Sequence, residues 1–131
     1  MMAATDLRAY LAEYRKQKRR IALLTEELEW QTGVAATGKN ICDALGEGDT
    51  LTPAATRVAR RLKDEIQKAE ERCDGIMKLI SRVEDVDTRT VMEEHYLNGA
   101  QFKKMIGYGE STAKRYHRRG LEELEKYYTA K

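Results

Sequence analysis

Residues 58–83 read VARRLKDEIQKAEERCDGIMKLISRV, and apolar or small side chains recur in this stretch at steps of three and four residues. This spacing keeps side chains on one face of a helix. The stripe consists of Val58, Leu62, Ile66, Ala69, Cys73, Ile76, Ile80 and Val83. Thr52 and Pro53 precede it, a capping hydroxyl followed by the residue favoured at the first helical position. We predict a long amphipathic helix from Pro53, in which Gly75 marks either a bend or a close contact.

A stripe of similar spacing nearer the N-terminus predicts another helix, over about residues 6–31. Its members are Leu7, Leu11, Tyr14, Lys18, Ile21, Thr25 and Leu28, with Tyr10 and Leu24 beside them. Residues 32–52 have no sustained period, so we expect a connection there, with a single helical turn near residues 40–45. Two helices joined in this way most simply form an antiparallel coiled-coil hairpin. Because Lys18 and Thr25 interrupt the first stripe, the C-terminal module or another copy of the chain would help to bury it.

The helical period changes after Val83, and shorter elements follow. A short helix capped by Asp87-Thr88 and ended by Asn98-Gly99 is expected to turn four residues to a core, Val91, Met92, Tyr96 and Leu97. Phe102 and Ile106, four residues apart before Gly107, indicate a second short helix, and a long helix is predicted from about residue 111 to residue 128. Three helices with a glycine-bearing turn between the last two outline a helix-turn-helix.

The predicted fold class is therefore all-α. It comprises an antiparallel coiled-coil helical hairpin over residues 1–83, with a loop at 32–52, followed by a three-helix helix-turn-helix module over residues 84–131.

Sequence motifs argue against catalysis and metal binding. Two cysteines and two histidines are too few and too scattered for a CxxC-type metal site, so Cys73 is expected in the core and Cys42 in a loop or short helix. Residues 33–40, GVAATGKN, approach a phosphate-binding loop but lack the preceding strand and the hydroxyl after the lysine. Paired carboxylates such as Glu70-Glu71 have no nucleophile and base beside them. We predict a protein that is not an enzyme and needs no cofactor or metal.

Hydrophobicity predicts no membrane contact. No stretch has the roughly twenty apolar residues of a membrane span. The first residues, MMAATDLRAYLAEYRKQ, carry an acid early and lack the apolar segment of a signal peptide. We expect a cytoplasmic protein.

Charge is segregated along the C-terminal part of the chain, although the net charge of the whole chain is only +2. Residues 84–97 hold five acids and one arginine, whereas residues 98–119 hold six lysines or arginines and one glutamate. The second segment therefore has a positive local field, which attracts a polyanion.

Most of these cations lie in residues 107–124, GYGESTAKRYHRRGLEEL. In a helix that starts near residue 111, an inward stripe is formed by Ala113, Tyr116, Gly120 and Leu124, and its two small residues allow close packing. The side chains predicted to point outward are Ser111, Thr112, Lys114, Arg115, Arg118 and Arg119. In a helix-turn-helix this half of the second helix enters the major groove, where Arg and Lys bind guanine edges or phosphates. The alternative, that these cations form only the solvated face of a helix, stays open.

Residues 91–128, VMEEHYLNGAQFKKMIGYGESTAKRYHRRGLEELEKYY, resemble the sigma-70 region-4-like helix-turn-helix and, more closely, small phage regulators of the RinA/ArpU type. Residues 107–109 match the GYS turn of these families, with Gly109 in place of the serine, and residues 112–121 match their recognition helix. The segment between Tyr96 and Gly107 is shorter than the family's usual spacing. Similar regulators place a charged helical hairpin ahead of this module, so the likeness extends weakly over the whole chain.

The residues and the resemblance together imply a sequence-specific double-stranded DNA-binding transcriptional regulator encoded by a phage or prophage. The expected groove contacts are Lys114, Arg115 and Arg118, and the expected phosphate contacts are Lys103, Lys104 and Arg119. The implied partners are double-stranded DNA, RNA polymerase and a second copy bound through the hairpin. Two alternatives are a phage DNA-packaging adaptor that resembles a small terminase subunit, and a module that binds RNA polymerase without touching DNA.

Overall fold

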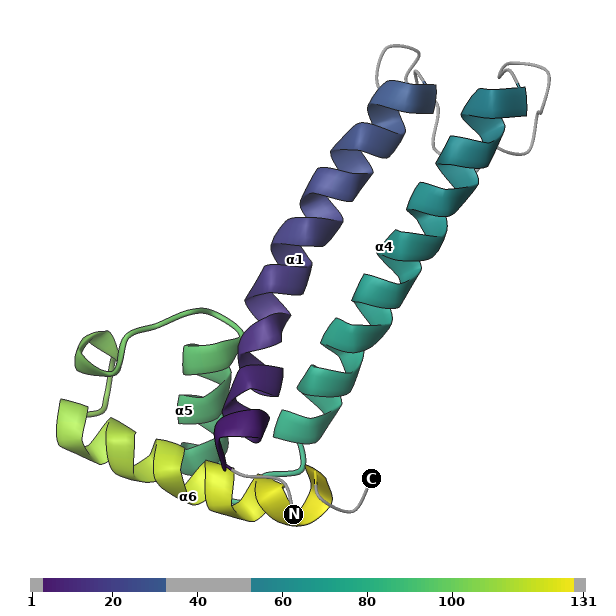
Figure 1. Cartoon of the computed structure of the whole chain (residues 1–131). Helices are drawn as coiled ribbons and strands as arrows, with labels where there is room; N and C mark the ends of the chain where they lie inside the picture. Colours follow the sequence, from purple (N-terminus) through teal and green to yellow (C-terminus); the bar gives the residue numbers. More distant parts are fainter. Residues whose placement is uncertain (1–3, 33–52, 129–131) are drawn as a thin grey trace. The chain divides into compact units, whose positions relative to one another are not determined.

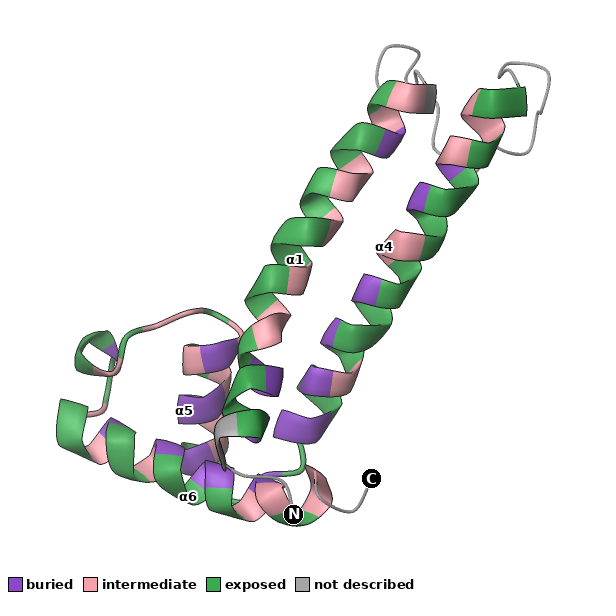
Figure 2. Cartoon of the chain, viewed as in Figure 1, coloured by how far each residue is buried: buried purple, intermediate pink, exposed green. Residues whose placement is uncertain are grey.

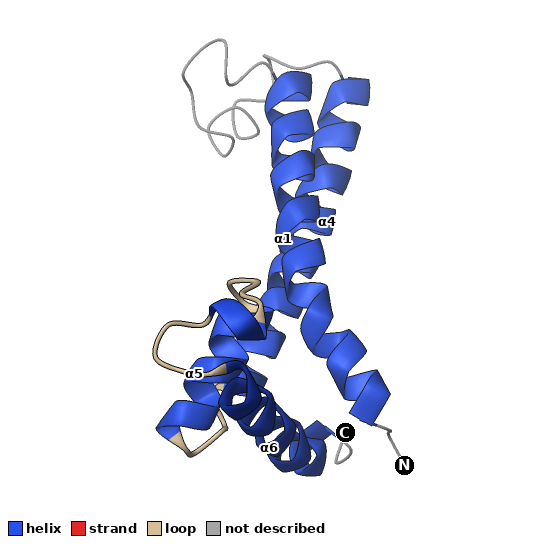
Figure 3. Ribbon diagram, turned by 90° about the vertical axis from the view of Figure 1, so that its left-hand side faces the viewer, coloured by secondary structure: helices blue, strands red, loops and turns tan. Residues whose placement is uncertain are grey.

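The computed structural model describes residues 4–32 and 53–128, and all regular structure in these ranges is helical (Figure 1, Figure 3). In chain order the elements are α1 (Ala4–Thr32), α4 (Pro53–Ile80), α5 (Val86–Tyr96), the 3-10 turn η1 (Phe102–Lys104) and α6 (Glu110–Tyr128). The predicted all-α class is confirmed, and α4 begins at the proline as expected. The expected connection after residue 32, with its helical turn and Cys42, lies outside the described residues.

The chain divides into two compact units. The first, called the terminal unit below, combines Met1–Lys16 with Arg72–Lys131, and the second, called the hairpin unit, is Gln17–Glu71. The boundary predicted between residues 83 and 84 therefore falls inside the terminal unit. The physical reason is a shared core, because the first turns of α1 and the last turns of α4 pack with α5 and α6.

In the hairpin unit, α1 and α4 pack through the two predicted stripes. The contact consists of Leu28, Ala59 and Leu62, which are buried, and Leu24, Val58 and Ile66, which are partly buried. Figure 2 shows the buried and intermediate positions on the facing sides of the two helices and exposed positions on their outer sides. Lys18 is exposed and Thr25 only partly buried, as expected for residues that interrupt the seam.

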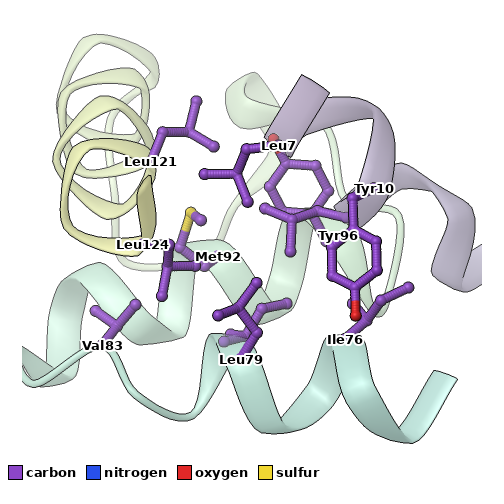
Figure 4. Packing of buried hydrophobic residues seen from close by; sticks show 11 residues of the cluster. Leu7, Tyr10, Ile76, Leu79, Val83, Met92, Tyr96, Leu121 and Leu124 are labelled. Carbon is purple, nitrogen blue, oxygen red and sulfur yellow. The ribbon is translucent and has the colours of Figure 1, made fainter. Parts of the chain in front are cut away.

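Four helices contribute to the core of the terminal unit (Figure 4). Its buried members are Leu7, Tyr10, Leu11, Ile76, Leu79, Ile80, Val83, Met92, Tyr96, Leu121 and Leu124. At Gly75 an added Cβ would lie 3.1 Å from the hydroxyl oxygen of Tyr10, so this glycine marks a close contact, one of the two predicted alternatives. Cys73 is buried, as predicted. Burial of these apolar side chains is the main force that holds the N-terminal and C-terminal segments of this unit together.

The N-cap of helix α5 lies two residues before the predicted cap at Asp87. Asp85 has the extended backbone of an N-cap residue, and its Oδ2 accepts hydrogen bonds from the backbone nitrogen of Thr88 at 2.9 Å and from its Oγ1 at 2.8 Å. These bonds satisfy a free donor of the first turn and hold the pKa of Asp85 below its usual value, with nearby arginines adding a smaller effect. Asp87, the predicted cap, instead accepts a bond from the Tyr108 hydroxyl at 2.9 Å.

The second helix predicted for the helix-turn-helix is a single 3-10 turn, η1. Its neighbour Met105 has extended backbone and is buried, whereas Ile106 is 96% exposed rather than facing a core. Gly99 and Gly107 have φ angles of 74° and 91°, which favour glycine and allow the chain to reverse before and after η1. The shortened connection thus leads from α5 to α6 with one turn of helix.

Candidate nucleic-acid interface

The buried face of α6 fixes which of its side chains remain outside. Five residues of this helix are buried, Ala113, His117, Gly120, Leu121 and Leu124. Three of the four residues predicted to face inward are among them, but Tyr116 is only partly buried. Sequence reasoning missed His117 and Leu121. Leu121 lies four residues after His117 and one turn from Leu124, which is a spacing signal that could have identified it.

His117 is buried because its ring finds a hydrogen-bond partner and an aromatic enclosure. The Tyr96 hydroxyl oxygen and Nε2 of His117 are 2.5 Å apart and share a hydrogen bond. The rings of His95 and Phe102 lie 5.3 and 5.0 Å from the His117 ring, centroid to centroid. Burial, with smaller contributions from His95 and Arg8, lowers the pKa of His117 to about 4, and burial raises the pKa of Tyr96 to about 12. At neutral pH the imidazole is therefore uncharged, and one of its ring nitrogens can accept a hydrogen bond.

Gly120 allows α6 to pack closely on α5. A Cβ at this position would lie 2.7 Å from both Cγ and Sδ of Met92, a side chain that is completely buried. The prediction that small residues permit close packing on this face is confirmed at Gly120. Together with the bond between Tyr96 and His117, this contact sets the rotation of α6 about its own axis.

With that rotation, the residues predicted to point outward do so, with one partial exception. Ser111, Lys114, Arg115, Arg118 and Arg119 are exposed, and Thr112 is partly buried. Lys103 and Lys104 are also exposed, on η1. At 3.6 residues per turn, Ser111, Arg115 and Arg118 form one stripe along the middle of the exposed arc, and Lys114 and Arg119 flank it on either side.

The two flanking cations have acidic neighbours. Nζ of Lys114 lies 3.1 Å from Oε2 of Glu110, one turn earlier on the same helix. The charge of Arg119 contributes to lowering the pKa of Asp85. Within the described ranges, Arg115 and Arg118 make no salt bridge, and the guanidinium of Arg115 lies 6.0 Å from the centre of the Tyr116 ring. The two central arginines are thus the cations best able to meet an external anion.

A second feature of this module was not predicted. A pocket of about 200 Å³ lies between α5 and the segment around η1, with Ala100 and Met105 among its lining residues and Glu94 and Lys104 supplying opposite charges. Ile106 also lines the pocket, although nearly all of its surface is exposed. The spacing of four residues between Phe102 and Ile106 predicts that both face a core, so the exposure of Ile106 could not be predicted from the sequence.

The described part of the chain offers neither a candidate metal site nor a candidate membrane span. No group of three or more His, Cys, Asp or Glu residues there is arranged to hold a metal ion. None of the described helices is sufficiently long and apolar to cross a membrane. Comparisons with protein-family models, curated proteins and solved structures gave no match for this chain.

Proposed function

We propose that this protein is a sequence-specific double-stranded DNA-binding transcriptional regulator, encoded by a phage or prophage, as the resemblance to RinA/ArpU-type regulators implies. The observation that carries the proposal is the exposed stripe of Ser111, Arg115 and Arg118 in the first half of α6. In this mechanism the stripe lies in the major groove, where each arginine can donate two hydrogen bonds to a guanine edge.

The remaining cations act on the DNA backbone. Lys114 and Arg119, on the flanks of the stripe, contact phosphates on opposite sides of the groove, and Lys103 and Lys104 of η1 contact the adjoining backbone. Lys114, which was predicted as a groove contact, becomes a phosphate contact because the helical register places it at the side of the stripe, where it also pairs with Glu110. Close packing at Gly120 supports the mechanism, since a reading helix needs a fixed rotation.

A second candidate is a module that binds a protein such as RNA polymerase. The pocket beside Ile106 favours it, because an isoleucine that is 96% exposed at the edge of a hollow is typical of protein contacts. The two candidates use different residues, so variants can separate them.

The test compares two double variants that remove the same charge. Binding to labelled duplexes, measured by fluorescence anisotropy, should weaken steeply as salt rises, with a slope of about −0.9 per phosphate contact. R115A/R118A should lose about 1–3 kcal/mol per base contact on a selected target, while R57A/R60A, which removes two exposed arginines of α4, should lose little.

Equal losses of duplex affinity in the two variants would show that the protein binds DNA only through non-specific electrostatic attraction. Binding that does not depend on salt would refute the phosphate contacts. Binding of RNA polymerase that is lost in I106E, in a protein that does not bind DNA, would favour the second candidate. The target itself can be obtained by selection from random duplexes with the purified protein.

A further inference from the structure

Two large apolar side chains of α1 are exposed in the hairpin unit. Leu23 is 68% exposed and Trp30 is 81% exposed. They are seven residues apart, which is two helical turns, so they lie on one stripe of the helix. An exposed pair of this size on one stripe differs from the isolated exposed apolar residues of ordinary surfaces.

This stripe is not the seam of the hairpin. The seam of α1 in this unit is formed by Leu24 and Leu28, which pack against α4. Leu23 and Trp30 have no place in that cluster, so the helix carries a second apolar stripe that α4 leaves uncovered.

Acidic side chains fill the turn between the two apolar ones. Glu26 and Glu27 lie three and four residues after Leu23, and four and three residues before Trp30, so all four share one side of the helix. An open hollow of about 420 Å³ is lined, among the described residues, by these four and by Gln31. We call these five residues the α1 outer stripe. It offers an apolar contact at each end and negative charge in the middle.

A second copy of the chain fits this surface poorly when it uses the same stripe. Symmetric pairing centred between Leu23 and Trp30 would bring Glu26 and Glu27 of one copy against the same residues of the other, and like charges repel. A short helix with apolar residues two turns apart and lysine or arginine between them is complementary to Leu23, Trp30, Glu26 and Glu27.

We propose that the α1 outer stripe is a docking surface for a basic amphipathic helix of a partner protein. The apolar side chains of that helix cover Leu23 and Trp30, and its cations meet Glu26 and Glu27. Trp30 supplies the principal anchor, since tryptophan is frequent among the residues that dominate binding energy at interfaces. The inference does not depend on DNA binding, because the α1 outer stripe lies in the hairpin unit and α6 in the terminal unit.

The test uses the fluorescence of Trp30, the single tryptophan of the chain. The full-length protein is titrated with a synthetic amphipathic Leu/Lys peptide of about four helical turns, and in parallel with a Leu/Glu peptide of the same pattern. Saturable binding with a blue shift of the emission is expected for the Leu/Lys peptide alone. E26Q/E27Q should weaken that binding at least tenfold. E70Q/E71Q, which neutralises two exposed acids of α4 in the same unit, should leave it unchanged.

Three results would overturn the proposal. Equal affinity in E26Q/E27Q and E70Q/E71Q would show that the acids of the α1 outer stripe do not select the peptide. Blue-shifted emission of the free protein at every concentration would show that the chain itself covers Trp30. A blue shift that grows with protein concentration would assign the surface to a second copy. R115A/R118A should bind the peptide like the wild type, which separates this inference from the proposed DNA binding.

Discussion

The stability of the terminal unit should fall between pH 6.5 and pH 4 because of one residue, His117. The fold lowers the pKa of this histidine from 6.5 to about 4, mainly through burial. Between these values the unfolded chain binds a proton on His117 that the folded chain does not bind. Stability contributed by the neutral ring is therefore complete above about pH 6.5 and is lost as the pH falls toward 4.

The size of the effect follows from the two pKa values. On lowering the pH from 7.5 to 5, linkage through His117 removes about 2 kcal/mol from the free energy of unfolding, and the limiting loss at lower pH is of the order of 3 kcal/mol. Asp85 has a lowered pKa as well, but its contribution is present above its ordinary value of 3.8 and disappears only at lower pH. The two groups therefore act in different pH windows.

The assay is urea unfolding followed by far-ultraviolet circular dichroism at intervals from pH 7.5 to pH 4, with an NMR titration of the ring protons of His117. The matched variant is H117Q, whose side-chain oxygen can accept the Tyr96 hydroxyl but does not titrate. It should lose most of the pH dependence between 6.5 and 4. A pKa of His117 near 6.5, or the same pH dependence in H117Q and the wild type, would refute the reasoning.

Three further substitutions test other contacts of the terminal unit. Tyr96→Phe removes the hydrogen-bond partner of His117 and should cost about 1–3 kcal/mol in urea unfolding, an effect that should shrink when His117 is also replaced by phenylalanine. Gly99→Ala and Gly107→Ala, at φ angles of 74° and 91°, should each cost about 1–2 kcal/mol in urea unfolding because an L side chain is strained there; the Arg15 guanidinium beside Gly99 can move aside, and unchanged stability in both variants would contradict this reasoning. Glu110→Gln should raise duplex affinity at low salt a few-fold by freeing Lys114, while lowering the melting temperature because an acid stabilises the first turn of α6; a fall in affinity would contradict this role of the pair.

The sequence by itself determined the all-α class and the start of α4 at Pro53, as well as the inward stripes of α1 and α4. These features depend on local physics, since apolar spacing, capping residues and proline act within a few residues of one another. The exposure of the cations on α6 was predicted for the same reason, because three small or apolar residues of that helix specify its inward side.

Only the tertiary structure decided features that depend on contacts distant in sequence. His117 is buried rather than Tyr116 because Tyr96, twenty-one residues earlier, satisfies its ring nitrogen. Asp85 caps α5 while Asp87 is engaged by Tyr108. The division of the chain into two units also depends on distant contacts, because side chains of the N-terminal and C-terminal segments share one core. The spacing of apolar residues within one helix does not reveal such contacts. The same limit applies to Trp30, whose exposure depends on which side of α1 the partner helix covers.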